Sequence, residues 1–377
     1  AGLAGSACQT KHAADSTTAV PEARAESATA VSEDSLDAWI GRMLMLGFRG
    51  MSLEESDHLA RDLREYQAGG VILFDYDVPN REPVRNIEDA QQVRRLTRQI
   101  RETARPGVLI AVDQEGGRVA RLKETRGFER GPSAQEVGQA GLDTARAVYR
   151  RQATQLADLG FNVNFAPSVD VNLNPDNPVI GSIGRSYSAN PAQVAAFAQT
   201  ALEAFHDRGV MGVIKHFPGH GSSREDSHHG LTDVTPYWDR VELDPFRTLI
   251  STGTARAVMS AHVMHREIDP DAPATLSAAF LTGMLRRDMG FDGILFSDDM
   301  QMGAIREEFG LEEAVVRAVL AGVDVLVFGN NSVYEPDIVP RAHAILREAV
   351  RDGRIPAGRL RESAERIERV SAEFGIR

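Results

Sequence analysis

From residue 35 onward, eight short apolar runs alternate with longer amphipathic segments, and this order constrains the fold more than any other feature. The intervening segments repeat apolar residues at three- and four-residue spacing, as at Val315, Val319 and Leu320, which is typical of helices. Strands that alternate with helices predict βαβ units and a parallel sheet. The expected strands cover residues 43–48, 71–74, 108–112, 163–166, 212–215, 257–261, 294–297 and 323–328.

Eight strands and eight helices in one chain predict a closed (β/α)₈ barrel of the TIM type. An open, doubly wound sheet would need a glycine-rich phosphate loop after its first strand, and residues 47–50 do not form one. No internal repeat or second domain is visible, so we expect a single barrel domain over residues 35–377. The expected helices cover about residues 52–67, 86–104, 138–160, 191–208, 242–252, 277–289, 311–322 and 335–352.

The first 34 residues have a different character. Residues 9–34 are rich in Ala, Ser, Thr and Glu and lack apolar periodicity, which predicts disorder. The only cysteine, Cys8, excludes an intrachain disulfide and follows a run of small residues. This pattern resembles a bacterial lipoprotein terminus, although Gly5 stands where an aliphatic residue is usual. We therefore expect an exported protein tethered to the membrane by a lipid on Cys8; the alternative is a cytoplasmic protein with an incidental cysteine.

The overall charge argues against one large class of partners. The chain carries a net charge of −12 and shows no basic stripe, so we do not expect nucleic-acid binding. No apolar run approaches the roughly 18 residues of a membrane-spanning helix.

Polar residues follow five of the expected strands. In an α/β barrel the carboxyl ends of the strands meet at one rim, where the chemistry is found. One such ending is more often a solvated loop or a helix cap, but five on one rim predict a concave polar site. The endings are Asp113 to Glu115, Asp170, Lys215 with His216, Ser260 to His262, and Ser297 to Asp299.

Asp298 is the candidate nucleophile or base at this rim. An aspartate before a helix is often its N-cap, but Asp299 can fill that role and leave Asp298 free. Asp226 and His228 lie two residues apart in a glycine-flanked loop. A carboxylate that holds one ring nitrogen of a histidine raises its basicity, so the other nitrogen can act as general acid or base.

Metal binding is the rival interpretation of the same loop. His216, His220, His228 and His229 could be ligands, but Pro218 prevents the helix that would align the first two. We expect neither a metal nor a cofactor.

Five further rim residues are candidates for orienting a polar substrate. Carboxylates and cations form directional hydrogen bonds of the kind that sugar hydroxyls accept and donate. Each cation alone would be read as a surface ion pair, and together on one rim they favour substrate binding. These residues are Asp113, Arg121, Arg185, Lys215 and His216.

The ordered set of motifs resembles glycoside hydrolase family 3, and within it the bacterial β-N-acetylglucosaminidase branch with a single barrel. Any one motif would be weak evidence, but they occur in family order across most of residues 40–330. The matching segments are residues 111–119, 177–181 with 184–186, 215–221 with 226–228, 273–277 and 297–300.

The resemblance implies a retaining mechanism in which Asp298 forms a covalent glycosyl-enzyme. It also implies that Asp226 and His228 are the acid/base pair peculiar to this branch, and that the five orienting residues bind sugar hydroxyls. Many glucosidases of the family take their acid/base residue from a second α/β domain, whereas this chain carries the Asp-x-His loop.

The substrate expected from the resemblance is a muropeptide with a terminal, non-reducing GlcNAc, cleaved during cell-wall recycling or turnover. Three alternatives stay open at this point: a broader β-glucosidase or β-xylosidase, cleavage by phosphate instead of water, and a catalytically silent glycan-binding protein. Since a neutral histidine does not repel an incoming phosphate, the sequence does not exclude phosphorolysis.

Overall fold

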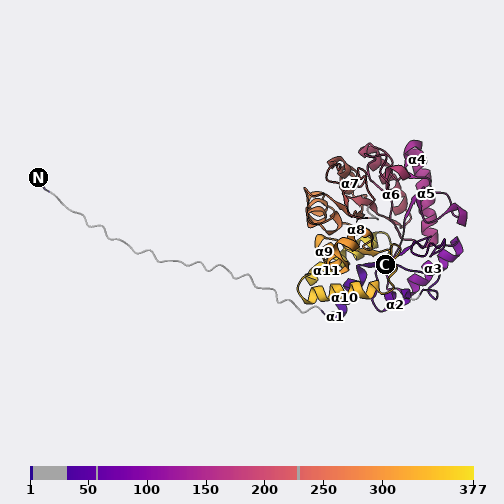
Figure 1. Cartoon of the computed structure of the whole chain (residues 1–377), viewed down its shortest axis with the longest axis horizontal. Coiled ribbons are helices and arrows are strands. Elements are labelled where there is room, and N and C mark those ends of the chain that lie inside the picture. Colours follow the sequence, from indigo (N-terminus) through magenta and orange to yellow (C-terminus); the bar gives the residue numbers. More distant parts are fainter. Residues whose placement is uncertain (3–31, 57, 227–229) are drawn as a thin grey trace. The chain divides into compact units, whose positions relative to one another are not determined.

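The computed structural model describes residues 1–2, 32–56, 58–226 and 230–377, and residues 32–377 form one compact unit. In this unit a parallel barrel is surrounded by helices (Figure 1). The barrel strands are β1 (Leu44–Gly47), β2 (Gly70–Leu73), β3 (Leu109–Val112), β6 (Val163–Asn164), β7 (Met211–Gly212) with β8 (Ile214–Phe217), β10 (Ala257–Ser260), β12 (Ile294–Phe296) and β13 (Leu326–Phe328).

The pairing of the strands closes the barrel. One sheet has the order β13-β1-β2-β3-β6-β7, and a second has the order β12-β10-β8. Only Val213 separates β7 from β8, and a parallel bridge between Phe296 and Val325 joins β12 to the start of β13. Every barrel pair is parallel, so the predicted (β/α)₈ barrel is confirmed.

Local signals place several helix ends. Asp89 caps α3 by accepting a hydrogen bond from the Gln92 amide, and Asn190 caps α6, which begins at Pro191. The helices are α1 (Glu33–Arg42), α2 (Leu59–Arg64), α3 (Ala90–Thr103), α4 (Ala134–Ala140), α5 (Leu142–Leu159), α6 (Pro191–His206), α7 (Asp244–Ser251), the π-helix η5 (Ala279–Asp288), α8 (Gly303–Phe309), α9 (Leu311–Ala321), α10 (Ile338–Arg351) and α11 (Ala357–Glu373). Within the described ranges, no helix is long and apolar enough to cross a membrane.

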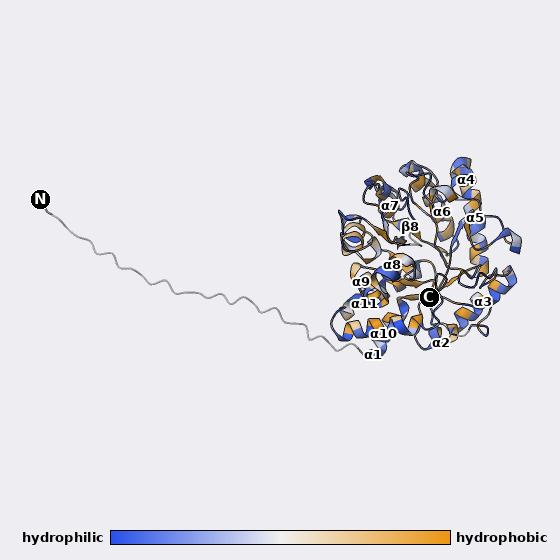
Figure 2. Cartoon of the chain, viewed as in Figure 1, coloured by the Kyte–Doolittle hydropathy of each residue, from blue (hydrophilic) through white to orange (hydrophobic). Residues whose placement is uncertain are grey.

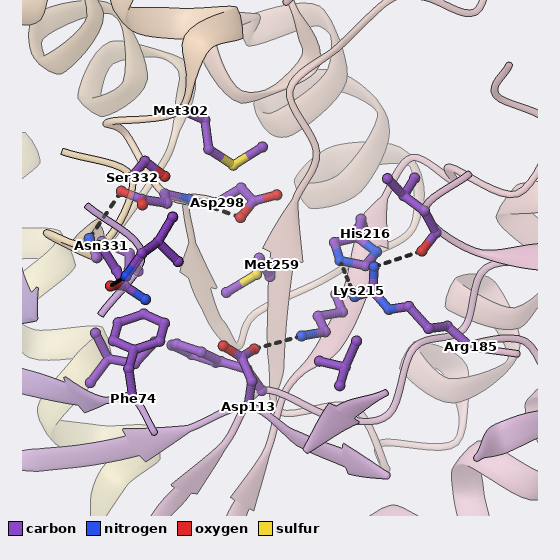
Figure 3. A pocket seen from close by; sticks show the side chains of 18 of the residues that line it. Phe74, Asp113, Arg185, Lys215, His216, Met259, Asp298, Met302, Asn331 and Ser332 are labelled. Atoms are coloured by element: carbon purple, nitrogen blue, oxygen red, sulfur yellow. Dashed lines mark hydrogen bonds and ion pairs between the residues drawn. The ribbon is translucent and has the colours of Figure 1, made fainter. Parts of the chain in front are cut away.

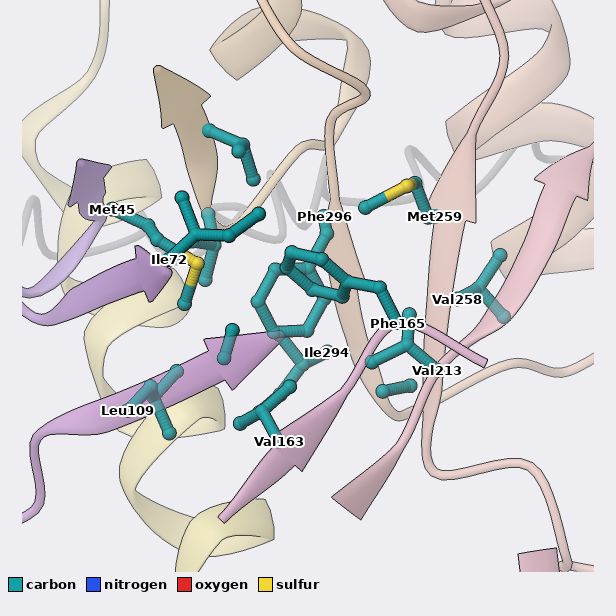
Figure 4. Close-up of a cluster of buried hydrophobic side chains, with 14 of the residues drawn as sticks. Met45, Ile72, Leu109, Val163, Phe165, Val213, Val258, Met259, Ile294 and Phe296 are labelled. Atoms are coloured by element: carbon teal, nitrogen blue, oxygen red, sulfur yellow. The ribbon is translucent and has the colours of Figure 1, made fainter. Parts of the chain in front are cut away.

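Side chains from strands on all sides fill the interior of the barrel. Figure 4 shows Met45, Leu109, Val258 and Phe296 reaching into one cluster from four different strands. The Phe165 and Phe296 rings meet edge to face with their centroids 5.3 Å apart. Since the helices cover the outer face as well, the strands are buried on both faces, and hydrophilic residues gather on the outer sides of the helices (Figure 2).

The structure contains all eight expected strands but differs from the prediction in its helices. The helix expected over 138–160 is divided at Gly141, whose φ of 88° lies in the region that favours glycine. The helix expected over 52–67 is reduced to α2. The helices α1, α8 and α11 were not expected, and α4 begins four residues before the expected helix. Helix α1 begins at Glu33, two residues before the expected start of the barrel domain.

Asp324, at the entrance to β13, ties the last helix to the barrel. Its buried carboxylate accepts hydrogen bonds from Arg286 Nη2 at 2.6 Å, the Leu295 amide at 3.0 Å, Ser363 Oγ at 2.7 Å and Arg366 Nη1 at 2.8 Å. Burial acts to raise the pKa of Asp324, but the charges of Arg286 and Arg366 outweigh it and hold the pKa below its ordinary value. The contacts join β12, η5 and α11 at a single group.

We expect Asp324→Ala to lower the free energy of unfolding by about 3–5 kcal/mol, because it leaves buried arginines without their counter-charge. Because the pKa is lowered, this stabilisation is complete at neutral pH and is lost as the pH falls through the acid range. Urea unfolding at pH 7 measures the loss.

The matched control is Asp292→Ala, which removes an exposed ion pair to Arg369 (2.8 Å) and should change the free energy of unfolding by less than about 1 kcal/mol. Equal, small losses in the two variants would contradict the structural role given to Asp324.

Candidate active site

A cavity of about 600 Å³ lies at the carboxyl ends of the barrel strands. Seven of the eight residues predicted to form the site line it, and they come from the ends of β3, β8 and β12 and from the loops that follow β3, β6 and β8. The seven are Asp113, Arg121, Arg185, Lys215, His216, Asp226 and Asp298. The eighth, His228, lies outside the described residues, as do His229 and Cys8.

Two cations and two carboxylates form a buried network on one wall of the cavity. Lys215 Nζ lies 2.8 Å from Asp113 Oδ1 and 2.7 Å from Glu115 Oε1, and Figure 3 shows the lysine directed at Asp113. Arg185 donates two hydrogen bonds to the Glu115 carboxylate, from Nε at 2.8 Å and from Nη2 at 2.6 Å. Such bidentate pairing fixes the orientation of the guanidinium as well as its position.

The network keeps all four groups charged. Burial acts against each charged form, but the opposite charges outweigh it: Lys215 and Arg121 lower the pKa of Asp113, and Arg185 and Lys215 lower that of Glu115. In the same way, burial is outweighed at the cations, where Asp113 and Glu115 raise the pKa of Lys215, and Glu115 raises that of Arg185. These groups therefore do not titrate near neutral pH.

Hydrogen bonds fix the tautomer of His216. Its Nε2 lies 3.1 Å from Arg185 Nη2, and a guanidinium can only donate, so Nε2 is the acceptor. Its Nδ1 lies 2.7 Å from Asp170 Oδ2, to which it donates. Burial acts to raise the pKa of Asp170, but His216 outweighs it and lowers the pKa. His216 is thus oriented from both sides, with its acceptor nitrogen toward the arginine.

Arg121 contacts the second carboxylate oxygen of Asp113 and links the network to Asp75. Its Nη2 lies 3.4 Å from Asp113 Oδ2, and its Nη1 lies 3.8 Å from Asp75 Oδ1, which also pairs through Oδ2 with Lys123 at 2.6 Å. These contacts are longer than those of Lys215, so Arg121 is held less tightly.

Asp298 and Asp299 both line the cavity, after β12. The Asp299 amide donates to Asp298 Oδ1 at 2.8 Å. Asp299 was expected to be the N-cap of the next helix, and this expectation is wrong in detail, because α8 begins at Gly303 after Met302. Instead, the Asp299 carboxylate accepts hydrogen bonds from the amides of Gln301 (3.0 Å) and Gly329 (2.9 Å), so it fixes the turn between β12 and α8.

Glu115 and Asp170 were not predicted to be site residues. Both had been noted as strand-end charges, and that position was the signal that could have identified them. The cavity is also lined by Phe74, Asn331 and Ser332, from the loops after β2 and β13, for which the sequence offers no motif. Among the residues that the structure describes, no group of three His, Cys, Asp or Glu side chains is arranged to hold a metal ion.

Residues 35–370 match the model of the Glycosyl hydrolase family 3 N terminal domain. A "Beta-hexosaminidase" of Tolumonas auensis is 38% identical over 294 residues, which cover 76% of this chain and 83% of that protein. "Beta-hexosaminidase LpqI" of Mycobacterium tuberculosis is 38% identical over 267 residues, which cover 68% of this chain and 66% of its own length.

The solved structures lead to the same family. A glycoside hydrolase family 3 beta-N-acetylglucosaminidase from Paenibacillus sp. matches with a TM-score of 0.82 and 36% identity, over 90% of this chain and 63% of that one. A beta-N-acetylhexosaminidase from Beutenbergia cavernae matches with a TM-score of 0.79 and 26% identity, over 89% and 98%. The protein is therefore a glycoside hydrolase. It belongs to glycosyl hydrolase family 3, and the resemblance to the β-N-acetylglucosaminidase branch is confirmed.

We expect Glu115→Gln to lower kcat/KM by roughly 10- to 100-fold, because charge-assisted hydrogen bonds are worth about 1.5–3 kcal/mol and both Lys215 and Arg185 lose one. Steady-state kinetics measure the effect. The control is Glu124→Gln, an exposed glutamate on the same side of the barrel, which should leave the kinetics unchanged. An unchanged Glu115→Gln enzyme would contradict the role of the network.

Proposed function

We propose that the protein is a retaining exo-β-N-acetylglucosaminidase that removes terminal, non-reducing GlcNAc from muropeptides derived from peptidoglycan. The observation that carries the proposal is the convergence of Asp298, Asp226 and the charged network of Lys215 in one cavity. The names of the relatives and of the solved neighbours support the choice of an N-acetylhexosamine over other sugars.

The charged wall supplies the directional groups that a sugar ring needs. The ionised Asp113 can accept hydrogen bonds from hydroxyls, while Lys215, Arg121 and Arg185 can donate them. His216 accepts a hydrogen bond from Arg185 and so helps to orient that guanidinium. Because this wall is held by its own ion pairs before substrate binds, little further ordering is needed on binding.

The proposed reaction has two steps. In the first, an Asp298 carboxylate oxygen attacks the anomeric carbon, the bond to the aglycone oxygen breaks, and His228 gives its proton to that oxygen. In the second, His228 takes a proton from water, which attacks the same carbon and releases Asp298. Two inversions at one centre give retention, and Asp226 orients His228 throughout.

We expect the protein to hydrolyse 4-nitrophenyl β-N-acetylglucosaminide and to leave the matching β-glucoside and β-xyloside nearly untouched. Asp298→Asn should lower kcat by about 10³-fold or more, because the attacking group is lost. The rate of 4-nitrophenol release measures both effects. Asp176→Asn, an exposed aspartate in the loop after β6, is the matched control and should keep full activity.

Other outcomes of this experiment would favour one of the alternative functions. Equal activity on the glucoside would indicate a broader glycosidase. A rate that rises with phosphate, with formation of a sugar 1-phosphate, would replace hydrolysis by phosphorolysis. Full activity in Asp298→Asn would contradict the assignment of the nucleophile.

We further propose that the residues before Ser32 tether the barrel domain to the cell envelope through a lipid on Cys8. The proposed tether ends before Ser32 and not at residue 34, because Ser32 caps α1, which begins at Glu33. In a bacterial host, radioactive palmitate should label the protein, and Cys8→Ser should abolish the label. Absence of label in the unaltered chain would contradict the tether and favour a cytoplasmic protein.

A further inference from the structure

A short segment that precedes α7 contacts the loop that carries Asp226 near the start of that loop. This segment, residues 237–242, contains Tyr237, Trp238 and the first part of the 3₁₀ helix η3 (Arg240–Leu243). Trp238 Nε1 donates to the Pro218 carbonyl at 3.2 Å, and the Arg224 guanidinium stacks 4.0 Å above the Tyr237 ring. The segment therefore contacts the loop at two separated points.

Glu242 makes the central contact between the segment and the loop. Its side chain is fully buried, with Oε2 accepting a hydrogen bond from the Gly221 amide at 2.7 Å and Oε1 accepting one from Ser222 Oγ at 2.5 Å. No Lys, Arg or His forms an ion pair with it in the described part of the chain. Burial raises the pKa of Glu242 to about 7, although the hydrogen bonds from Ser222 and Gly221 partly offset it.

The loop is fixed on its other side by the segment that follows β6. The Asp170 carboxylate accepts a hydrogen bond from the His220 amide at 2.8 Å, and Asn177 Nδ2 donates to the His220 carbonyl at 2.6 Å. A Cβ atom added at Gly221 would lie 1.7 Å from the Val171 carbonyl oxygen, so the chain passes there in direct contact. The start of the loop is held between two walls, and Glu242 is the polar group of one of them.

We propose that Glu242 is a positioning residue that sets the path of residues 218–226 and so fixes where Asp226 lies at the cavity. Glu242 does not line the cavity, whereas Asp226, four residues beyond Ser222, does. The inference rests on the proposed function, because it assumes that Asp226 and His228 supply the proton to the leaving group. It adds a residue outside the cavity on which proton transfer depends.

Substrates whose leaving groups differ in acidity can distinguish a misaligned acid/base pair from a general loss of activity. A good leaving group such as 2,4-dinitrophenol needs little protonation, whereas phenol needs it fully. We expect Glu242→Ala and Glu242→Asp to lower kcat/KM on the phenyl β-N-acetylglucosaminide by roughly 10- to 100-fold. On the dinitrophenyl glycoside the loss should be less than about 3-fold.

Glu242→Gln should restore the rate on the phenyl glycoside, because an amide can accept from the Gly221 amide and donate to Ser222 Oγ. Asp239→Ala is the matched control: Asp239 is exposed, caps η3 and is in the same segment. It should leave the leaving-group dependence unchanged. Thermal unfolding of each variant verifies the fold, and Glu242→Asp keeps the test valid if the alanine variant does not fold.

An equal loss for all leaving groups, or no loss in either shortened variant, would overturn the role of Glu242. His228→Ala, measured in parallel, separates this failure from that of the proposed function. If His228→Ala shows steep leaving-group dependence and the Glu242 variants show none, only the positioning role is wrong. If His228→Ala shows no such dependence, the acid/base assignment itself is wrong.

Discussion

The site depends on a buried network of four charges at the rim of the barrel, formed by Lys215, Asp113, Glu115 and Arg185. It joins the ends of β3 and β8 to the loop after β6, so segments distant in sequence are held together at the cavity. Removing one member of a buried ion pair leaves an uncompensated charge, which costs more than an exposed pair ever contributes. The same charged groups are already held in place by their ion pairs, so they could hydrogen bond to a sugar with little rearrangement.

The strands of the fold were predictable because their physical signal is strong. A strand covered by helices outside and by side chains inside is apolar throughout, and all eight such runs became barrel strands. The helices were predicted less well. In α11 the buried residues Leu360, Ala364 and Ile367 recur at helical spacing, and this signal was present but overlooked. The short α4 and α8 depend on glycine breaks and packing that sequence periodicity does not reveal.

The sequence was enough to predict that the candidate residues lie together, but it did not predict the contacts among them. Seven of eight proposed residues line one cavity because parallel strands bring their carboxyl ends to one rim. Which of the strand-end charges face substrate and which support their neighbours could not be read from the sequence. Glu115 and Asp170 resemble the other rim charges in the sequence, yet Glu115 orients Arg185 and Asp170 orients His216. Glu242 carries no motif, and only its contact with the loop distinguishes it.

Mass spectrometry can detect the covalent bond that we propose between Asp298 and the sugar. The protein is mixed with an activated 5-fluoro-N-acetylglucosaminyl donor, whose fluorine slows release of the intermediate, and is then quenched and digested. We expect a mass increase of one fluorinated sugar on the peptide that contains Asp298, and no such increase in Asp298→Asn. Label on another residue, or turnover of the donor without any labelled peptide, would contradict it.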